Sequence, residues 1–155
     1  RQRQMCIRDS IDAGGLYFMK EFGCPSNAII TPHPGEAAML LDCSVEELQK
    51  NRLEAAKELY KRYNCLIILK GYRTIVFDGE AYQCTDGGPA LSTAGTGDVL
   101  AGLIGSFLAQ GLSKIDAARF SVAIHGAAGD KFSKNKRVRG LTATKLIKII
   151  NEEML

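Results

Sequence analysis

The sequence predicts an α/β fold in which helices cover both faces of a mostly parallel sheet. Two short, continuous aliphatic runs, residues 28–31 and 66–69, are typical of strands that are buried on both faces. Segments with helical periodicity surround these runs, and Asp78-Gly79 between two further apolar runs predicts a hairpin. Because only two or three parallel strands are predicted, fewer than an average sheet has, we expect an incomplete sheet.

The first half of the chain is predicted to alternate strands and helices. Its elements are, in order, the end of a strand at 11–13, a helix at 16–22, a strand at 28–31, and helices at 35–41, from Ser44, and at 52–63. Gly23 and Pro25 end the first helix, and Pro34 suits the first turn of the next. Ser44 with Glu47 has the pattern of a capping box. The apolar face predicted for helix 52–63 consists of Leu53, Ala56, Leu59, Tyr60 and Tyr63.

The second half of the chain is predicted to contain a buried strand, a hairpin and three helices. These elements are the strand 66–69, the hairpin strands 74–77 and 81–84, and helices at 99–108, 114–132 and 143–154. Ser113 with Asp116 begins the second of these helices, and Thr142 caps the last one. In the last helix, the residues expected to face inward are Leu146, Ile149 and Ile150.

A glycine-rich turn at 94–97 leads directly into the apolar helix 99–108. Small residues let main-chain N–H groups approach a ligand closely, and a helix N-terminus adds further N–H groups and the positive end of its dipole. The combination predicts an anion site for phosphate. Asp98 lies beside it and has two interpretations. It is either a first-turn carboxylate that the dipole favours, or a base that takes a proton from a nearby hydroxyl.

The composition narrows the class of protein. The chain has 155 residues, 46% of them hydrophobic and 24% charged, which suits one packed domain. A net charge of +3 does not indicate nucleic-acid binding, and the basic residues at 131–139 are typical of a helix end and loop. The five cysteines have neither metal-ligand nor redox spacing. With no membrane-length apolar run and no signal-peptide pattern, a cytoplasmic protein with reduced thiols is expected.

Three segments carry a specific resemblance to a known family. They are, in chain order, Thr31-Pro32-His33-Pro34-Gly35-Glu36, Leu69-Lys70-Gly71 with Thr74, and Ala94-Gly95-Thr96-Gly97-Asp98-Val99-Leu100-Ala101-Gly102. Together they resemble the ADP/ATP-dependent NAD(P)H-hydrate dehydratases of the ribokinase-like superfamily, and Asp12-Ala13 and residues 125–130 also fit. The resemblance covers 11–155, about the C-terminal half of that domain. It therefore implies a three-layer α/β/α fold without its N-terminal half, whereas residues 1–10 are expected to be a non-native leader or an artefact.

The resemblance implies repair of damaged nicotinamide cofactors. The S form of NADH hydrate or NADPH hydrate would lose water at the expense of ADP, giving AMP and phosphate, or of ATP. Phosphorylation makes the ring hydroxyl a good leaving group, so the task of the protein is positioning and charge stabilisation. Mg²⁺ carried by the nucleotide is expected from phosphoryl-transfer chemistry, although no metal-ligand cluster is evident in the sequence. A homo-oligomer and a fused or separate NAD(P)H-hydrate epimerase are the expected protein associations, without nucleic acid or membrane.

Site roles follow from the matched positions. Asp98 would contact the hydroxyl of the hydrate and accept its proton, and His33 would also contact the hydrate. Gly95, Thr96 and Gly97 would donate main-chain N–H groups to the transferring phosphate, and Gly97 would touch the nucleotide. The nucleotide-binding segment would be Lys70, Gly71, Tyr72, Arg73 and Thr74.

Other residues have simpler interpretations or depart from the family. Glu36 is expected to be an ordinary first-turn carboxylate and His125 a packed core histidine. Gly14 stands where the family has a second aspartate, and Gly88 where it often has asparagine. We expect the chain alone to have little dehydratase activity and to expose an apolar sheet edge. Two alternatives stay open: a ribokinase-like kinase of a vitamin precursor or sugar, and a nucleotide-binding remnant without catalysis.

Overall fold

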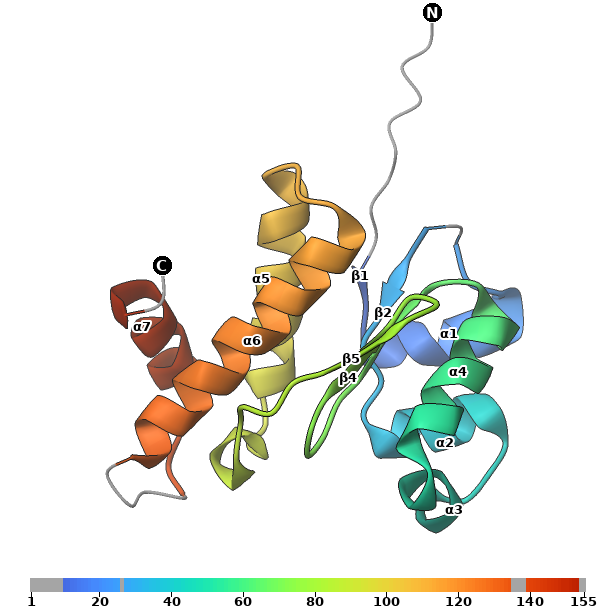
Figure 1. The fold of residues 1–155 in the computed structure, drawn as a ribbon, viewed down its shortest axis with the longest axis horizontal. Helices are drawn as coiled ribbons and strands as arrows, with labels where there is room; N and C mark the ends of the chain where they lie inside the picture. Colours follow the sequence, from blue (N-terminus) through green and yellow to red (C-terminus); the bar gives the residue numbers. More distant parts are fainter. Residues whose placement is uncertain (1–9, 26, 135–138, 154–155) are drawn as a thin grey trace, which may run out of the picture.

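The computed structural model describes residues 10–25, 27–134 and 139–153. Within these residues a sheet lies between two groups of helices, so the predicted α/β/α layering is confirmed (Figure 1). One face carries α1 (Gly14–Phe22), α2 (Pro34–Leu41), α3 (Val45–Lys50) and α4 (Arg52–Tyr63). The other face carries α5 (Thr96–Ala109), α6 (Lys114–Ser133) and α7 (Ala143–Glu153).

The described residues form a five-stranded mixed sheet in the order β1-β2-β3-β4-β5. Its strands are β1 (Ser10–Ile11), β2 (Ile29–Ile30), β3 (Leu66–Leu69), β4 (Ile75–Phe77) and β5 (Ala81–Gln83). The first three are parallel, with Ile29 opposite both Ser10 and Leu66. β3, β4 and β5 are antiparallel to one another in turn, because the turn at Asp78-Gly79 folds β5 back on β4. The parallel part is thus the β1–β3 half of the sheet.

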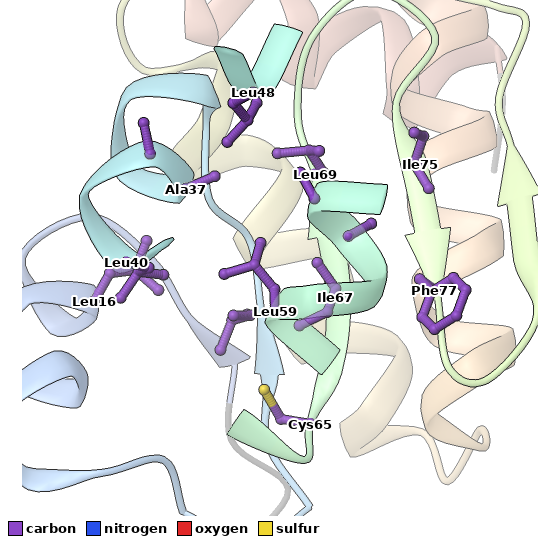
Figure 2. Close-up of a cluster of buried hydrophobic side chains, with 14 of the residues drawn as sticks. Leu16, Ala37, Leu40, Leu48, Leu59, Cys65, Ile67, Leu69, Ile75 and Phe77 are labelled. Atoms are coloured by element: carbon purple, nitrogen blue, oxygen red, sulfur yellow. The ribbon is translucent and has the colours of Figure 1, made fainter. Parts of the chain in front are cut away.

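Two apolar cores flank the sheet because side chains alternate along its strands. In β3, Ile67 and Leu69 point toward α1–α4, where they pack with the side chains of Figure 2. Leu66 and Ile68 point toward α5 and α6 on the opposite face. All four side chains are fully buried, which explains why this strand reads as a continuous aliphatic run.

Most predicted boundaries agree with the structure, and the differences are local. Leu53 is 38% exposed, so its predicted burial is wrong, and Ala55 is buried in its place. Ser44 accepts the N–H of Glu47, but no described hydrogen bond completes a capping box there. A 3₁₀ turn, η1 (Pro89–Leu91), was not predicted.

Two expectations concern residues that the structure does not describe. Residues 1–9 and Met154 lie outside the described residues, so the interpretation of 1–10 as a leader stays a prediction. Ser10 is the first described residue and pairs in β1, which is an edge strand of the described sheet. Of the helices in the described ranges, none combines the length and hydropathy needed to cross a membrane.

Candidate functional site

Three chain segments meet where the parallel strands end. Asp12 follows β1, residues 31–33 follow β2 and lead into α2, and Lys70 follows β3. Thr31 N–H donates to the Ile11 carbonyl at 3.1 Å, and Lys70 N–H donates to the Pro32 carbonyl at 2.9 Å. These bonds hold the segments side by side at the edge where open α/β sheets bind ligands.

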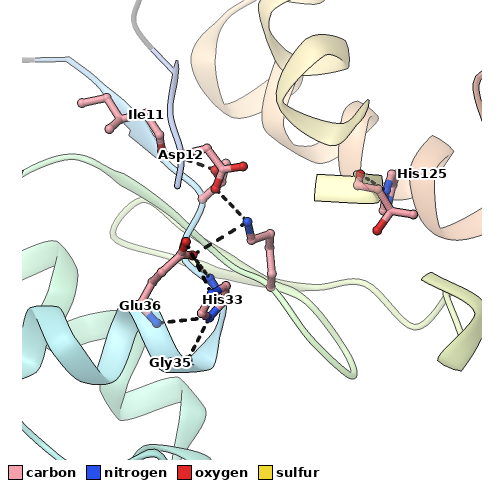
Figure 3. A network of polar contacts seen from close by, with 9 residues as sticks. Ile11, Asp12, His33, Gly35, Glu36 and His125 are labelled. Carbon is pink, nitrogen blue, oxygen red and sulfur yellow. Dashed lines mark hydrogen bonds and ion pairs between the residues drawn. The ribbon is translucent and has the colours of Figure 1, made fainter. Parts of the chain in front are cut away.

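Lys70 lies at the centre of this edge. Its Nζ is 2.7 Å from Asp12 Oδ1 and 3.9 Å from Glu36 Oε2 (Figure 3). The Lys70 and Asp12 side chains are only 19% and 14% exposed, so water screens their attraction less than it would at the surface. A methyl group placed on Gly97 would lie 3.4 Å from Nζ. The ammonium therefore sits against the first turn of α5.

His33 and Glu36 form a capping box at the start of α2 (Figure 3). His33 Nδ1 accepts the N–H groups of Gly35 at 3.0 Å and Glu36 at 3.1 Å, and Glu36 Oε2 accepts the N–H of His33 at 2.7 Å. Since Nδ1 accepts, the neutral ring carries its proton on Nε2. The side chain is 57% exposed, which leaves it accessible to a ligand. Glu36 is thus a first-turn carboxylate, as predicted, and also a capping residue, which was not predicted.

The turn before α5 presents unused N–H groups. Gly95, the N-cap residue, has a φ of +85°, which favours glycine, and no side chain caps the helix. Thr96 N–H donates to the Thr93 carbonyl at 3.3 Å, so Thr96 anchors the turn. Among the described hydrogen bonds, none uses the N–H of Gly97 or Asp98. These free donors at a helix N-terminus suit an anion.

Two cavities lie on either side of this turn. One, of about 270 Å³, has Gly97 in its wall together with Lys70, Gly71, Tyr72, Thr74 and His125. The other, of about 440 Å³, lies between α5 and α7 and has Asp98 in its wall together with Gly95, Ser106 and Asn151. Asp98 is exposed and not sealed in the core. We call these the Lys70 cavity and the Asp98 cavity. The glycine-rich turn at 94–97 lies between them.

Segment 70–74 forms the outer wall of the Lys70 cavity. It bends sharply, with a φ of +132° at Gly71 and +54° at Arg73, and the Thr74 hydroxyl donates to the Gly71 carbonyl at 3.0 Å. Tyr72 is 76% exposed, and the Arg73 guanidinium lies 5.5 Å from the centroid of its ring. Of the predicted nucleotide-binding residues, Arg73 is the one that does not line this cavity.

His125 forms the wall on the α6 side. Its Nε2 donates to the Thr96 carbonyl at 2.9 Å and so ties α6 to the first turn of α5. Burial lowers the pKa of His125, and the charge of Lys70 lowers it further against the opposing effect of that hydrogen bond. The neutral ring is therefore favoured. His125 is packed, as the sequence indicated, but it also belongs to the site.

The comparison with known protein families shows to which family this chain belongs. The sequence pattern of the NAD(P)H-hydrate dehydratase family matches residues 9–152. The chain belongs to this family. The resemblance carried by the three segments is therefore confirmed, and the ribokinase-like fold with it.

Two similar proteins are both named for the repair or dehydration of NAD(P)H hydrate. The chain is 42% identical over 143 residues to the bifunctional NAD(P)H-hydrate repair enzyme Nnr of Vibrio cholerae, covering 91% of this chain and 29% of that protein. It is 44% identical over 110 residues to the ADP-dependent (S)-NAD(P)H-hydrate dehydratase of Neisseria meningitidis, covering 70% of this chain and 37% of that protein. The chain thus spans only about a third of these dehydratase-family relatives.

A solved member of the family has the same fold. The ADP/ATP-dependent NAD(P)H-hydrate dehydratase of Bacillus subtilis, co-crystallised with ATP/Mg²⁺, superposes with a TM-score of 0.85 at 33% identity. The match covers 93% of this chain and 53% of that one. Since the family members are longer, the low activity expected of this chain alone stays a prediction.

Proposed function

We propose that the protein carrying this chain dehydrates the S form of NADH hydrate and NADPH hydrate, with ADP or ATP as the phosphoryl donor. Family membership supports the reaction class, and the names of the relatives from Neisseria meningitidis and Bacillus subtilis support the substrates. One observation in this chain carries the proposal. The Lys70 ammonium lies against Gly97, whose N–H is unused among the described hydrogen bonds, and Asp98 is next along the helix.

The nucleotide would bind in the Lys70 cavity. Its phosphates would accept hydrogen bonds from the Lys70 ammonium and the Gly97 N–H, since a helix N-terminus favours anions. The exposed Tyr72 ring offers a stacking surface, and Arg73 offers a second cation. Thr96 would act mainly by holding the turn, because its own N–H is already bonded to Thr93.

The hydrate would enter from the Asp98 cavity; His33, a second proposed contact, caps α2 and is not among the described residues that line either cavity. Asp98 would accept the proton of the ring hydroxyl while the hydroxyl oxygen attacks the terminal phosphorus of the nucleotide. The bond to the remaining nucleotide breaks and releases AMP from ADP, or ADP from ATP. The C–O bond then breaks, phosphate leaves with assistance from the ring nitrogen, and the adjacent ring carbon loses a proton. The first-turn N–H groups of α5 would stabilise the charge on the transferring phosphate.

The nucleotide is the proposed carrier of Mg²⁺. Beside Gly97 lie the Lys70 ammonium, which suits phosphate oxygens, and the Asp12 carboxylate, which is already paired with that ammonium. Bound with the nucleotide, Mg²⁺ would reduce the negative charge of the phosphates. A cytoplasmic location, a homo-oligomer and an NAD(P)H-hydrate epimerase on the same or a partner chain belong to the same proposal. The Vibrio cholerae relative is named a bifunctional enzyme, which supports a second activity in that protein.

The deciding experiment follows the absorbance of reduced nicotinamide after hydrated NADH and ADP or ATP are added to the intact protein. A dehydratase raises the absorbance and releases phosphate. A small-molecule kinase would leave the absorbance unchanged and phosphorylate an alcohol, and a binding remnant would bind nucleotide without turnover. Either result would contradict the proposal.

Matched aspartate variants separate the two interpretations of Asp98. Asp98 and Asp116 are both first-turn carboxylates, in α5 and α6. If Asp98 is the base, Asp98→Asn lowers kcat by about 10²–10⁴-fold and keeps nucleotide affinity, whereas Asp116→Asn retains turnover. If Asp98 serves only the helix dipole, each variant loses about 0.3–1 kcal/mol of stability and neither loses turnover.

A further inference from the structure

An arginine begins α4, where the helix dipole disfavours a cation. Arg52 directly follows the N-cap residue Asn51, at the positive end of the dipole. Its guanidinium is half-buried, and this burial lowers the pKa of Arg52. Among the ion pairs between described residues, none includes Arg52. A half-buried cation in an unfavourable place needs compensating contacts.

The compensating contacts lie at the end of β3. Arg52 Nη2 donates to the carbonyls of Leu69 at 3.0 Å and Lys70 at 3.2 Å, and Nη1 donates to Gln49 Oε1 at 3.1 Å. A methyl group on Gly71 would lie 2.7 Å from Nη1, so the guanidinium packs directly against the main chain. The φ of +132° at Gly71 belongs to the region that favours glycine. A planar guanidinium suits such paired acceptors better than an ammonium does.

Lys70 is consequently held at three points. Its N–H donates to the Pro32 carbonyl at 2.9 Å, its carbonyl accepts from Arg52, and its Nζ pairs with Asp12. The first two contacts fix the main chain from which the side chain leaves. Arg52 lies 18 positions before Lys70 and supplies the two charge-assisted bonds that the main chain of residues 69–71 accepts among the described hydrogen bonds.

We propose that Arg52 is a positioning residue for nucleotide binding. Its guanidinium sets the main chain of residues 69–71 so that the Lys70 ammonium meets a phosphate beside Gly97. Arg52 is not among the described residues that line the two cavities, so it acts through Lys70 and not on the substrate. This inference rests on the proposed function, because that function assigns segment 70–74 to ADP or ATP.

The test compares two arginines of α4 in the intact protein. Arg62 is the matched control, because its Nη1 also donates to a main-chain carbonyl, that of Leu40 at 2.7 Å, away from both cavities. Calorimetry with ADP and with ATP/Mg²⁺ measures affinity, and the assay of hydrated NADH gives KM for each substrate. Arg52→Gln should weaken nucleotide binding about tenfold with little change in KM for the hydrate. Arg52→Lys should recover part of the affinity, and Arg62→Gln should bind nucleotide as wild type does.

Each other outcome has a defined meaning. Equal nucleotide affinity in Arg52→Gln and Arg62→Gln, with wild-type turnover present, overturns the role of Arg52 and leaves the proposed function standing. If Arg52→Gln does not fold, Arg52→Lys replaces it, since it keeps the charge but loses the planar group that donates to both carbonyls. Wild-type nucleotide affinity in Arg52→Lys would then overturn the inference. A wild-type protein that binds neither ADP nor ATP overturns both proposals together.

Discussion

Lys70 Nζ and Asp12 Oδ1 lie 2.7 Å apart between the ends of β3 and β1, with side chains 19% and 14% exposed. Removing two charges from water is costly, so such a pair is weak evidence for stability alone. The position of the Lys70–Asp12 pair in the candidate site explains its presence better than stability does. The ammonium faces Gly97 at the start of α5, where unused N–H groups already favour an anion. In the proposed function, Asp12 would hold this cation in place for a phosphate.

The strength of this pair can be measured with a double-mutant cycle. Asp12→Asn alone should lower the free energy of unfolding by about 1–3 kcal/mol, because it leaves the ammonium without its nearest partner. Lys70→Met in the same background should cost less than it does alone. We expect a coupling energy of about 1 kcal/mol or more from urea unfolding of the four proteins.

An exposed ion pair within α4 provides the control. Glu54 and Lys57 in α4 are 2.7 Å apart but 59% and 47% exposed. Their coupling should stay below about 0.5 kcal/mol, because water screens the charges and ordering two side chains costs entropy. Similar coupling energies for the two pairs would mean that the low exposure of Lys70 and Asp12 has no energetic consequence.

Glu36 should matter to the hydrate through His33. Glu36→Ala removes the acceptor of the His33 N–H and should cost about 1 kcal/mol of stability. It should also raise KM for the hydrate, since Glu36 Oε1 lies 3.5 Å from His33 Nε2 and its loss frees that end of the imidazole, whereas Glu36→Gln retains an acceptor there. Ser44→Ala is the control: it removes the cap of α3, which lines neither cavity in the described part of the chain. A KM change of equal size in Ser44→Ala would contradict the link.

Patterns within short stretches of sequence predicted the strands and helices whose formation depends on neighbouring residues. The continuous run Leu66–Leu69 gave the bounds of β3, and helical periodicity gave those of α4. Within α4 the pattern misassigned Leu53, because small Ala55 satisfies the buried face and is not distinctive in a sequence. The capping box of α2 was missed because histidine is not among the usual N-cap residues. Proline at the first helical position with glutamate two residues later was the available signal.

The remaining site residues could not be predicted, because their roles depend on contacts between distant positions. Asp12 meets Lys70 across 58 positions, His125 meets Thr96 across 29, and Arg52 meets the Leu69 carbonyl across 17. Nothing in the neighbouring sequence specifies these partners. They follow only once the parallel strands bring their carboxyl ends to one edge.

Gly97 should be replaceable for folding but not for binding. A methyl group there would meet Lys70 Nζ at 3.4 Å and Asp12 Oδ2 at 3.7 Å, which are ordinary contacts. Gly97→Ala should therefore fold and gain up to about 1 kcal/mol from helix propensity. The methyl group would occupy space beside the ammonium, so nucleotide affinity measured by calorimetry should fall about tenfold, the effect of about 1.4 kcal/mol.

Another glycine of α5 separates the two effects. A methyl group on Gly105 would have no heavy atom within 4 Å, and Gly105 lines neither cavity among the described residues. Gly105→Ala should gain similar stability and bind nucleotide as wild type does. Undiminished nucleotide affinity in Gly97→Ala would instead argue that phosphate lies elsewhere.

Stability in mild acid should depend on His125. Burial lowers the pKa of His125 in the folded protein, whereas in the unfolded chain the ring titrates near its ordinary value of about 6.5. Below that pH the unfolded state binds a proton that the folded state does not, so stability rises with pH there. The contribution of the neutral ring is thus complete above about pH 6.5 and is lost as the pH falls toward the folded pKa.

Replacing His125 by glutamine tests this dependence. Glutamine can still donate an N–H to the Thr96 carbonyl, but it does not titrate. Between about pH 7.5 and 5.5, the unfolding free energy of wild type should fall relative to His125→Gln, by at most about 1.4 kcal/mol per pH unit. Parallel curves for wild type and His125→Gln would mean that the ring titrates alike in the folded and unfolded states.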